Sequence, residues 1–280
     1  MSASDPRPPA VLHVDLDGAR PIFAAHGWSY GTGPDRLFAS GMESALAFFA
    51  RQGVRATLFA IAEDLDDPAK RALLRAAVDA GHEIASHTWT HRKLTSVPAG
   101  ERAREIADSR RALEDALGVP VTGFRAPGFA LDAAALRAVT EAGYGWDSSL
   151  FGGGPNPLGG ETPRRPFRLA EAAQTLELPL PPFRPLPVPW HPSYALVLGR
   201  PWFRAGLGLA RRGAAPLVML FHLTDFADPD PAARGLLQQV FTLSFLSRSA
   251  KIARLDSMLA SVRARHRIVT TAELLPERAA

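Results

Sequence analysis

The stretch Ser86-His87-Thr88-Trp89-Thr90-His91 places two imidazoles four residues apart, directly after residues 81–86, which have the pattern of a short buried strand. On one helical turn, His87 and His91 would face the same side and could bind one metal ion. Both follow the carboxyl end of a predicted strand, where α/β folds place their chemistry. Because such a pair also arises by chance on a solvated helix, its interpretation as a metal site requires a third ligand.

Carboxylates that could complete the site follow the first predicted strand, residues 11–14. Asp15 and Asp17 are two residues apart, so on an extended chain they point to the same face, about 7 Å from each other. One could bind the ion while the other acts as a base. A lone aspartate at a strand end more often caps a turn, so the residues by themselves leave these assignments open.

The chain has 280 residues, 46% of them hydrophobic, and no cysteine. This favours a single large domain, residues 11–280, after a polar, proline-rich tail, residues 1–10, that we expect to be disordered. Without thiolates, a metal must be bound by His, Asp or Glu. The N-terminus lacks the apolar core of a signal peptide and no apolar run approaches about twenty residues, so we expect a cytoplasmic protein.

The formal charge of +4 comes from arginines spread along the chain rather than from one basic block, which gives nucleic-acid binding no support. The same charge could attract anionic lipid head groups. The arginine-flanked apolar segment from Pro201 to Arg212 could make peripheral contact with the inner membrane surface, although such a segment is more often a solvated helix.

Strand-like runs alternate with helix-like segments in seven or eight βα units. We expect helices to begin at the capping pattern of residues 40–43 and at Asp67-Pro68, and a further helix over residues 99–117. The apolar stripe in residues 232–265 is expected to face the core. These features predict a distorted, incomplete (β/α) barrel of about seven parallel strands rather than an open doubly wound sheet.

Further candidate residues lie in connections and at strand ends. Trp28 belongs to a long aromatic connection, residues 19–39, that could be a substrate lid or a packed surface loop. His191 lies in a Gly- and Pro-rich stretch, residues 150–203, that we expect to shape a cleft, and it could contact a ligand. His222 follows the most hydrophobic strand, where a lone histidine is most often structural.

The ordered motifs resemble those of polysaccharide deacetylases, carbohydrate esterase family 4, which have the NodB-homology fold. They are Asp15-Leu-Asp17-Gly18, His87-Thr-Trp-Thr-His91, Arg125-Ala-Pro127-Gly128, Trp146-Asp147-Ser-Ser and Leu220-Phe-His222. The resemblance implies a distorted barrel of seven βα units and a metal-dependent amide hydrolase acting on N-acyl amino sugars. By position it makes Asp17, His87 and His91 the metal ligands, Asp15 the base, Arg125 its orienting partner, His222 the acid and Asp147 a partner of His222.

Two departures from the common family pattern bear on these roles. The Asp-Leu-Asp spacing resembles the branch that includes lipid-linked amino-sugar deacetylases and deformylases, and there the roles of Asp15 and Asp17 could be exchanged. Gly128 stands where an aromatic residue is common. We expect Pro127 and Gly128 to contact substrate, and the glycine leaves the nature of that contact open.

The residue types in these motifs suit metal-dependent amide hydrolysis. Two imidazoles and a carboxylate favour one divalent ion, zinc first, with cobalt, nickel, manganese and iron as alternatives. We expect a hydrolase that removes an acetyl or formyl group from an amino sugar, in a glycan precursor or a lipid-linked sugar. The alternatives are hydrolysis of non-sugar amides or cyclic imides, and a catalytically silent glycan-binding module, against which the retained Asp15 and His222 argue.

Overall fold

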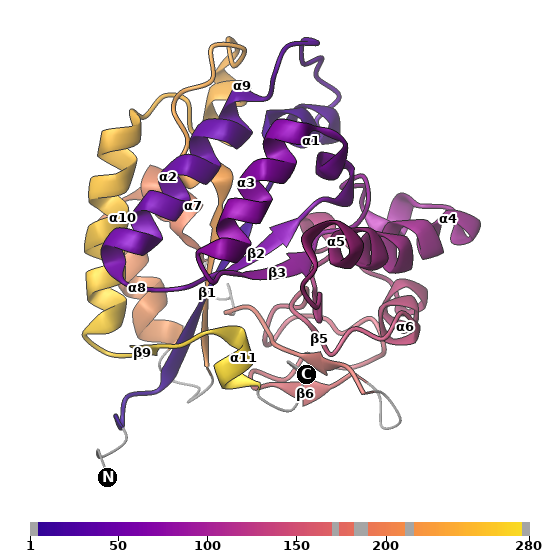
Figure 1. Cartoon of the computed structure of the whole chain (residues 1–280). Helices are drawn as coiled ribbons and strands as arrows, with labels where there is room; N and C mark the ends of the chain where they lie inside the picture. The colour runs from indigo at the N-terminus through magenta and orange to yellow at the C-terminus, as the bar shows by residue number, and fades with distance from the viewer. Residues whose placement is uncertain (1–4, 170–173, 182–189, 211–215, 276–280) are drawn as a thin grey trace.

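A curled sheet of nine strands forms the centre of the computed structural model, which describes residues 5–169, 174–181, 190–210 and 216–275. The sheet curls into a half-barrel, and helices cover its outer face (Figure 1). The strand order is β6-β7-β5-β4-β3-β2-β1-β8, and β9 also pairs with β1. All pairings between these strands are parallel except that of β6 with β7. The predicted distorted (β/α) barrel is thus confirmed. The strands are β1 (Pro9–Asp15), β2 (Thr57–Ala60), β3 (Glu83–Ser86), β4 (Gly123–Phe124), β5 (Trp146–Asp147), β6 (Phe167–Arg168), β7 (Leu176–Glu177), β8 (Leu217–His222) and β9 (Arg267–Ile268).

Several helices begin or end at residues with clear capping signals. The side chain of Asp67 accepts from the backbone N–H groups of the first turn of α3, and Gly53 ends α2 in the left-handed conformation. The predicted helix over residues 99–117 consists of α4 and α5 joined by a π-helical segment, Arg104–Asp108. The helices are α1 (Ala19–Ala25), α2 (Arg36–Gln52), α3 (Pro68–Asp79), α4 (Ala99–Ala103), α5 (Ser109–Leu117), α6 (Ala133–Glu141), α7 (Pro192–Leu198), α8 (Arg200–Ala210), α9 (Leu236–Phe241), α10 (Arg248–Arg263) and α11 (Thr271–Leu274).

Helix α2 begins four residues before the predicted capping pattern. Its N-cap is Asp35, whose Oδ1 accepts from Phe38 N at 3.1 Å and also from Ala19 N at 3.1 Å. Asp35 thereby caps α1 and α2 together. Ser40, the predicted cap, instead accepts a hydrogen bond at its hydroxyl oxygen from Asp228 N. The start of α2 is therefore set by a local N-cap, Asp35, that the sequence interpretation passed over in favour of Ser40.

Strand β1 separates two apolar layers. Ala10, Leu12 and Val14 belong to the large cluster between the sheet and the helices, whereas Val11 belongs to a cluster inside the half-barrel. Because side chains alternate along a strand, His13 and Asp15 share the inner face with Val11. The strand begins at Pro9, so residues 9 and 10 are part of the barrel rather than of the predicted tail.

Two expectations about the later helices have different outcomes. The predicted apolar stripe is buried in α10 but not in α9, which buries none of its residues; Leu236 is 79% exposed. In α8, Phe203 and Leu207 are buried against the core, as in a helix of the barrel shell; Arg212, the end of the predicted membrane-contact segment, lies outside the described residues. No described helix is both long and apolar enough to cross a membrane.

Candidate active site

Three side chains converge at the carboxyl ends of β1 and β3. Asp17 Oδ1 lies 3.0 Å from His91 Nε2 and 3.4 Å from His87 Nε2, and one ligand atom from each residue lies within 4.8 Å of the others. Apart from this close approach to each other and to His87, Asp17 Oδ1 and His91 Nε2 are buried without a hydrogen bond to any described residue. Buried polar atoms without partners are costly unless a cation binds them. The predicted metal ligands therefore lie together, in an arrangement that fits a divalent ion.

The two histidines lie in a loop after β3, and the predicted helical turn was wrong. Thr88 and His91 have φ angles of 70° and 62°, in the left-handed region that interrupts a helix. Glu105, from the π-helical segment, accepts hydrogen bonds at Oε2 from Trp89 N at 3.1 Å and Thr90 N at 2.9 Å. These backbone groups bond to a buried carboxylate instead of a helical ladder, and the loop brings the two imidazoles to one side.

The orientation of His87 is set by a backbone carbonyl. Its Nδ1 lies 2.8 Å from Arg125 O, and because a carbonyl oxygen only accepts, Nδ1 carries the proton and donates. Nε2 is then the nitrogen that faces Asp17, as in histidines that bind metals. Burial alone would raise the pKa of Asp17, but the neighbouring His91 and His87 outweigh burial and hold that pKa well below its ordinary value.

Asp15 lies close both to this group and to His222. Its Oδ2 is 3.9 Å from His87 Nε2 and 3.9 Å from His222 Nε2. Its Oδ1 accepts a 2.7 Å hydrogen bond from Nη1 of Arg125, which is fully buried. Arg125 also donates to the carbonyl and hydroxyl oxygens of Ser148, at 2.7 and 2.9 Å. The predicted contact between Arg125 and Asp15 is thus present, and it leaves Oδ2 directed toward the histidines.

His222 is held by Ser193 of α7 and by Asp225, which follows β8. In the register of β1 and β8, Asp15 is paired with His222. His222 Nδ1 lies 3.0 Å from Ser193 Oγ, and its backbone N–H donates to Asp225 Oδ2 at 3.0 Å. The ring of His191 lies 5.2 Å from that of His222, so the structure brings this predicted ligand-contact residue to the site. Burial, and then the neighbouring His222, lower the pKa of His191 well below its ordinary value, which keeps this ring neutral.

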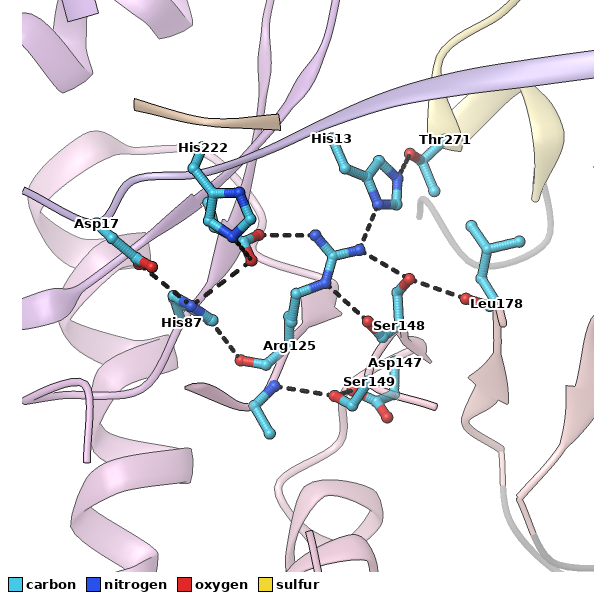
Figure 2. A network of polar contacts seen from close by, with 12 residues as sticks. His13, Asp17, His87, Arg125, Asp147, Ser148, Ser149, Leu178, His222 and Thr271 are labelled. Atoms are coloured by element: carbon cyan, nitrogen blue, oxygen red, sulfur yellow. Dashed lines mark hydrogen bonds and ion pairs between the residues drawn. The ribbon is translucent and has the colours of Figure 1, made fainter. Parts of the chain in front are cut away.

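Asp147 does not lie against His222, and its predicted partnership was wrong. It lies on the opposite side of Arg125 from His222 in Figure 2. Its Oδ1 accepts from Ser149 Oγ at 2.7 Å, and Ser149 Oγ accepts from Ala126 N at 2.9 Å. Across the β5–β7 pairing, Asp147 is the register partner of Glu177. Asp147 therefore anchors the turn after Arg125, while Ser193 and Asp225 are the groups that hold His222.

The predicted substrate contacts Pro127 and Gly128 form a turn after β4. Gly128 has a φ of 59°, which favours glycine over residues with a Cβ. A Cβ at this position would lie 3.4 Å from Lys93 Cε, so the Lys93 side chain lies over the turn. Lys93 follows His91 by two residues, and the turn is therefore next to the loop that carries the metal ligands.

Trp28 belongs to a packed surface loop. Its ring stacks on His26 at 4.6 Å and lies 6.0 Å from Phe241 of α9. Tyr30 OH donates to Asp230 Oδ2 at 3.0 Å and fastens the same loop to the segment before α9. Of the two alternatives for residues 19–39, these contacts favour the packed loop over a lid.

Sequence analysis did not predict several residues of the site. They differ in whether the sequence offered any sign of their role. His13 precedes Asp15 by two residues and shares its strand face, so the alternation of β1 could have identified it. Ser148 lies within the Trp146-Asp-Ser-Ser motif, and Asp225 follows His222 by three residues. Ser193 and Glu177 had no local signal, because only the barrel brings them to the site.

Comparisons with known proteins relate part of the chain to polysaccharide deacetylases. The polysaccharide deacetylase family model matches residues 25–146, a range that includes His87, His91 and Arg125 but neither Asp15 nor His222. The chain is 31% identical over 100 residues to a chitin deacetylase of Pestalotiopsis sp, covering 35% of this chain and 34% of that protein. It is 27% identical over 148 residues to a peptidoglycan deacetylase of Helicobacter pylori, covering 49% of this chain and 48% of that protein. The chain thus spans a third to a half of the length of these relatives.

A solved structure extends the likeness to the whole fold. A Mycobacterium smegmatis protein assigned to the polysaccharide deacetylases superposes with a TM-score of 0.68, over 99% of this chain and 92% of that one, at 20% identity. At this identity the likeness concerns the fold. The match over residues 25–146 shows that this part of the chain carries a polysaccharide deacetylase family domain, and the half-barrel is the fold of that solved structure.

Proposed function

We propose that this chain is a metal-dependent hydrolase that removes an acetyl or formyl group from the nitrogen of an amino sugar, in a glycan precursor or a lipid-linked sugar. The observation that carries the proposal is the position of Asp15, whose Oδ2 lies 3.9 Å from both His87 Nε2 and His222 Nε2. The Asp15 carboxylate thus lies between an imidazole of the metal-binding group, His87, and a second imidazole, His222. The names of the two relatives, a chitin and a peptidoglycan deacetylase, support N-acyl sugars as the substrate class.

Asp17, His87 and His91 would hold the ion, and their donor set fits zinc before cobalt, nickel, manganese or iron. A divalent ion bound there would act as a Lewis acid on a carbonyl oxygen and would make a water molecule more acidic. The unpartnered Asp17 Oδ1 and His91 Nε2 support this placement. The Arg125 hydrogen bond to Asp15 supports Asp17 rather than Asp15 as the ligand.

Asp15 would act as the general base. Arg125 donates to Oδ1 and fixes the carboxylate, so the basic oxygen Oδ2 is presented to the site in one orientation. A water molecule between Asp15 and the three ligands could give its proton to Oδ2. The hydroxide left by this transfer would add to the carbonyl carbon of the N-acyl group.

His222 would act as the general acid for the leaving amine. Its Nε2 points toward Asp15, and Ser193 holds Nδ1 on the opposite side. His191 stays neutral beside it and so adds no positive charge that would compete for the proton. The two proton-transfer groups are therefore adjacent but separately oriented.

Metal content and acyl release, measured on the same samples, test the proposal. We expect about one ion per chain in the purified protein and release of acetate or formate from N-acylated glucosamine oligomers. Asp17→Ala and His87→Ala should lose both metal and activity. Asp15→Ala should lose activity and keep metal. Asp79→Ala, a matched change at an exposed aspartate on α3, should keep both.

The possible contrary results are distinct. Metal lost in Asp15→Ala but kept in Asp17→Ala would reverse the roles of the two aspartates. Turnover of small cyclic imides or non-sugar amides without turnover of N-acyl sugars would replace the substrate class. Absence of metal after reconstitution with zinc, cobalt, nickel, manganese and iron would refute the hydrolase mechanism and favour a glycan-binding role.

A further inference from the structure

His13 is a polar residue in the middle of the strand that carries Asp15. It is fully buried inside the half-barrel, with its ring 5.1 Å from that of Phe59 and 5.6 Å from that of Trp146. Two residues before Asp15 on β1, it points to the same face. A buried imidazole among aromatic rings requires partners for both nitrogens, and the structure supplies one on each side.

The first partner is Arg125. Its Nη2 lies 2.8 Å from His13 Nδ1, and a guanidinium can only donate, so Nδ1 must accept with its lone pair. His13 is therefore neutral and carries its single proton on Nε2. Burial, and then the charge of Arg125, hold the pKa of His13 well below its ordinary value, consistent with this state.

The second partner is Thr271, the first residue of α11, whose Oγ1 lies 3.0 Å from His13 Nε2. Beyond it, Thr271 Oγ1 lies 2.7 Å from Thr57 Oγ1, which donates to Glu83 Oε2 at 2.6 Å. A carboxylate only accepts, so Thr57 gives its proton to Glu83 and accepts from Thr271. The Thr271 oxygen is then free to accept from His13 Nε2–H. Every hydrogen bond in this row has one possible direction.

We infer that His13 is a positioning residue: with its tautomer set by Thr271, it accepts one N–H of Arg125 and so holds the guanidinium that orients the carboxylate of Asp15. Figure 2 shows the part of this row that runs from Thr271 through His13 to Arg125. Arg125 then donates to the proposed base, Asp15. This inference rests on the proposed function only in that Asp15 is the base. None of His13, Thr271 and Thr57 contacts the group of Asp17, His87 and His91 through any described hydrogen bond.

Two substitutions separate the two nitrogens of His13. His13→Asn places an amide oxygen near the position of Nδ1, keeping the acceptor for Arg125 without reaching Thr271. His13→Gln places an amide nitrogen near the position of Nε2, keeping the donor to Thr271 while leaving Arg125 without its acceptor. We expect His13→Asn to keep kcat within about threefold and His13→Gln to lose about tenfold or more, with KM and metal content unchanged in both. If His13 only filled space in the core, the two variants would not differ in kcat in this order.

Thr271 offers a second matched pair if His13→Gln fails to fold. Thr271→Val removes the hydroxyl that sets the tautomer and should lower kcat in the same direction, whereas Thr271→Ser keeps the hydroxyl and should restore it. Equal kcat in His13→Asn and His13→Gln, or wild-type kcat in Thr271→Val, would overturn the inference.

A nitrogen-15 NMR spectrum of histidine-labelled wild-type protein gives a readout that does not depend on activity. We expect the His13 proton on Nε2 and a slowly exchanging Arg125 side-chain N–H, with the slow exchange lost in Thr271→Val. A proton on Nδ1, or a charged His13 ring at neutral pH, would also overturn the inference. If wild-type protein shows the expected spectrum but releases no acyl group, the proposed function fails while the positioning of Arg125 stands.

Discussion

Arg125 donates hydrogen bonds to Asp15, His13 and Ser148 from a fully buried position, and its guanidinium carbon lies 4.0 Å from the centre of the Phe59 ring. No other side chain among the described residues joins β1, β4 and the turn after β5 in this way. A buried ion pair of this kind contributes little net stability compared with an apolar replacement of both partners. Removal of one partner alone, however, leaves the other charge buried and uncompensated.

Arg125→Met is therefore expected to lower the free energy of unfolding by about 3–5 kcal/mol. Urea denaturation followed by circular dichroism measures this change. Arg111→Met is the matched control, because Arg111 pairs with Asp108 at the surface and its side chain is 67% exposed, and its loss should stay below about 1 kcal/mol. Similar losses in the two variants would show that the Asp15 carboxylate is not buried in solution.

Asp147 and Glu177 form a second buried pair, of two like groups. Burial raises the pKa of Glu177 well above its ordinary value, and the neighbouring Asp147 raises it further; burial also raises the pKa of Asp147. An acid whose pKa is raised in the folded state stabilises the protein below its unfolded pKa, near 4.5 for glutamate. That contribution is lost as pH rises through the folded-state pKa.

Glu177→Gln removes this titration and keeps the shape of the side chain. From about pH 5 to about pH 9, we expect the free energy of unfolding of the wild type to fall relative to that of Glu177→Gln. Denaturant titrations at several pH values measure the difference. Glu141→Gln, at an exposed position on α6, should remain parallel to the wild type. A Glu177→Gln difference that stays constant with pH would contradict the raised pKa of Glu177.

At the scale of elements, the consecutive helices α9 and α10 differ in how many apolar side chains they bury. α9 buries no residue, whereas α10 buries Leu255 and Leu259, among others. Local hydrogen bonds at its N-terminus stabilise α9. Gln238 Oε1 accepts from Gly235 N at 2.9 Å and from Arg234 N at 3.1 Å. Its apolar side chains therefore contribute little to the stability of the fold.

Replacement of Leu236 and Leu237 together by alanine should change the free energy of unfolding by no more than about 0.5 kcal/mol. The same substitution at the buried Leu255 should cost about 2–5 kcal/mol, because it leaves a cavity in the core. Urea denaturation of the double variant and of Leu255→Ala provides the comparison. A loss of several kcal/mol in the α9 variant would mean that this helix is covered in solution.

At the scale of the whole molecule, the candidate site joins segments that are distant in sequence. Asp17 follows β1, and His87 and His91 follow β3, so an ion bound by all three would link two loops of the half-barrel. A ligand that binds only the folded state stabilises that state by mass action. Metal withdrawal should therefore lower the stability of the entire fold.

Treatment with a chelator should lower the melting temperature of the zinc-loaded wild type, since a ligand at about 100 times its Kd contributes about 2.7 kcal/mol. Differential scanning calorimetry with and without chelator measures the shift. Asp17→Ala should show little change, and Asp79→Ala should respond as the wild type does. Identical melting of the wild type in both conditions would contradict a metal held by these three residues.

Much of the fold followed from local chemistry. The caps at Asp67 and Gly53, the apolar runs of β1, β2, β3 and β8, and the polar residues at their ends depend on neighbours within a few positions. The order of the motifs then identified the family and the convergence of Asp17, His87 and His91. Such features are predictable because their hydrogen bonds and their period of burial are local.

The tertiary structure alone decided which side chains meet across the barrel. The partners of Arg125 are 110 and 112 residues away, at Asp15 and His13, and Thr271 lies 258 residues from His13. Asp147 took Glu177 rather than His222 as its neighbour because β5 pairs with β7. The exposure of α9 likewise depends on what packs beside it. Local patterns determined the strands and their chemical groups, whereas strand order and register, set by packing of the whole chain, determined the contacts of those groups.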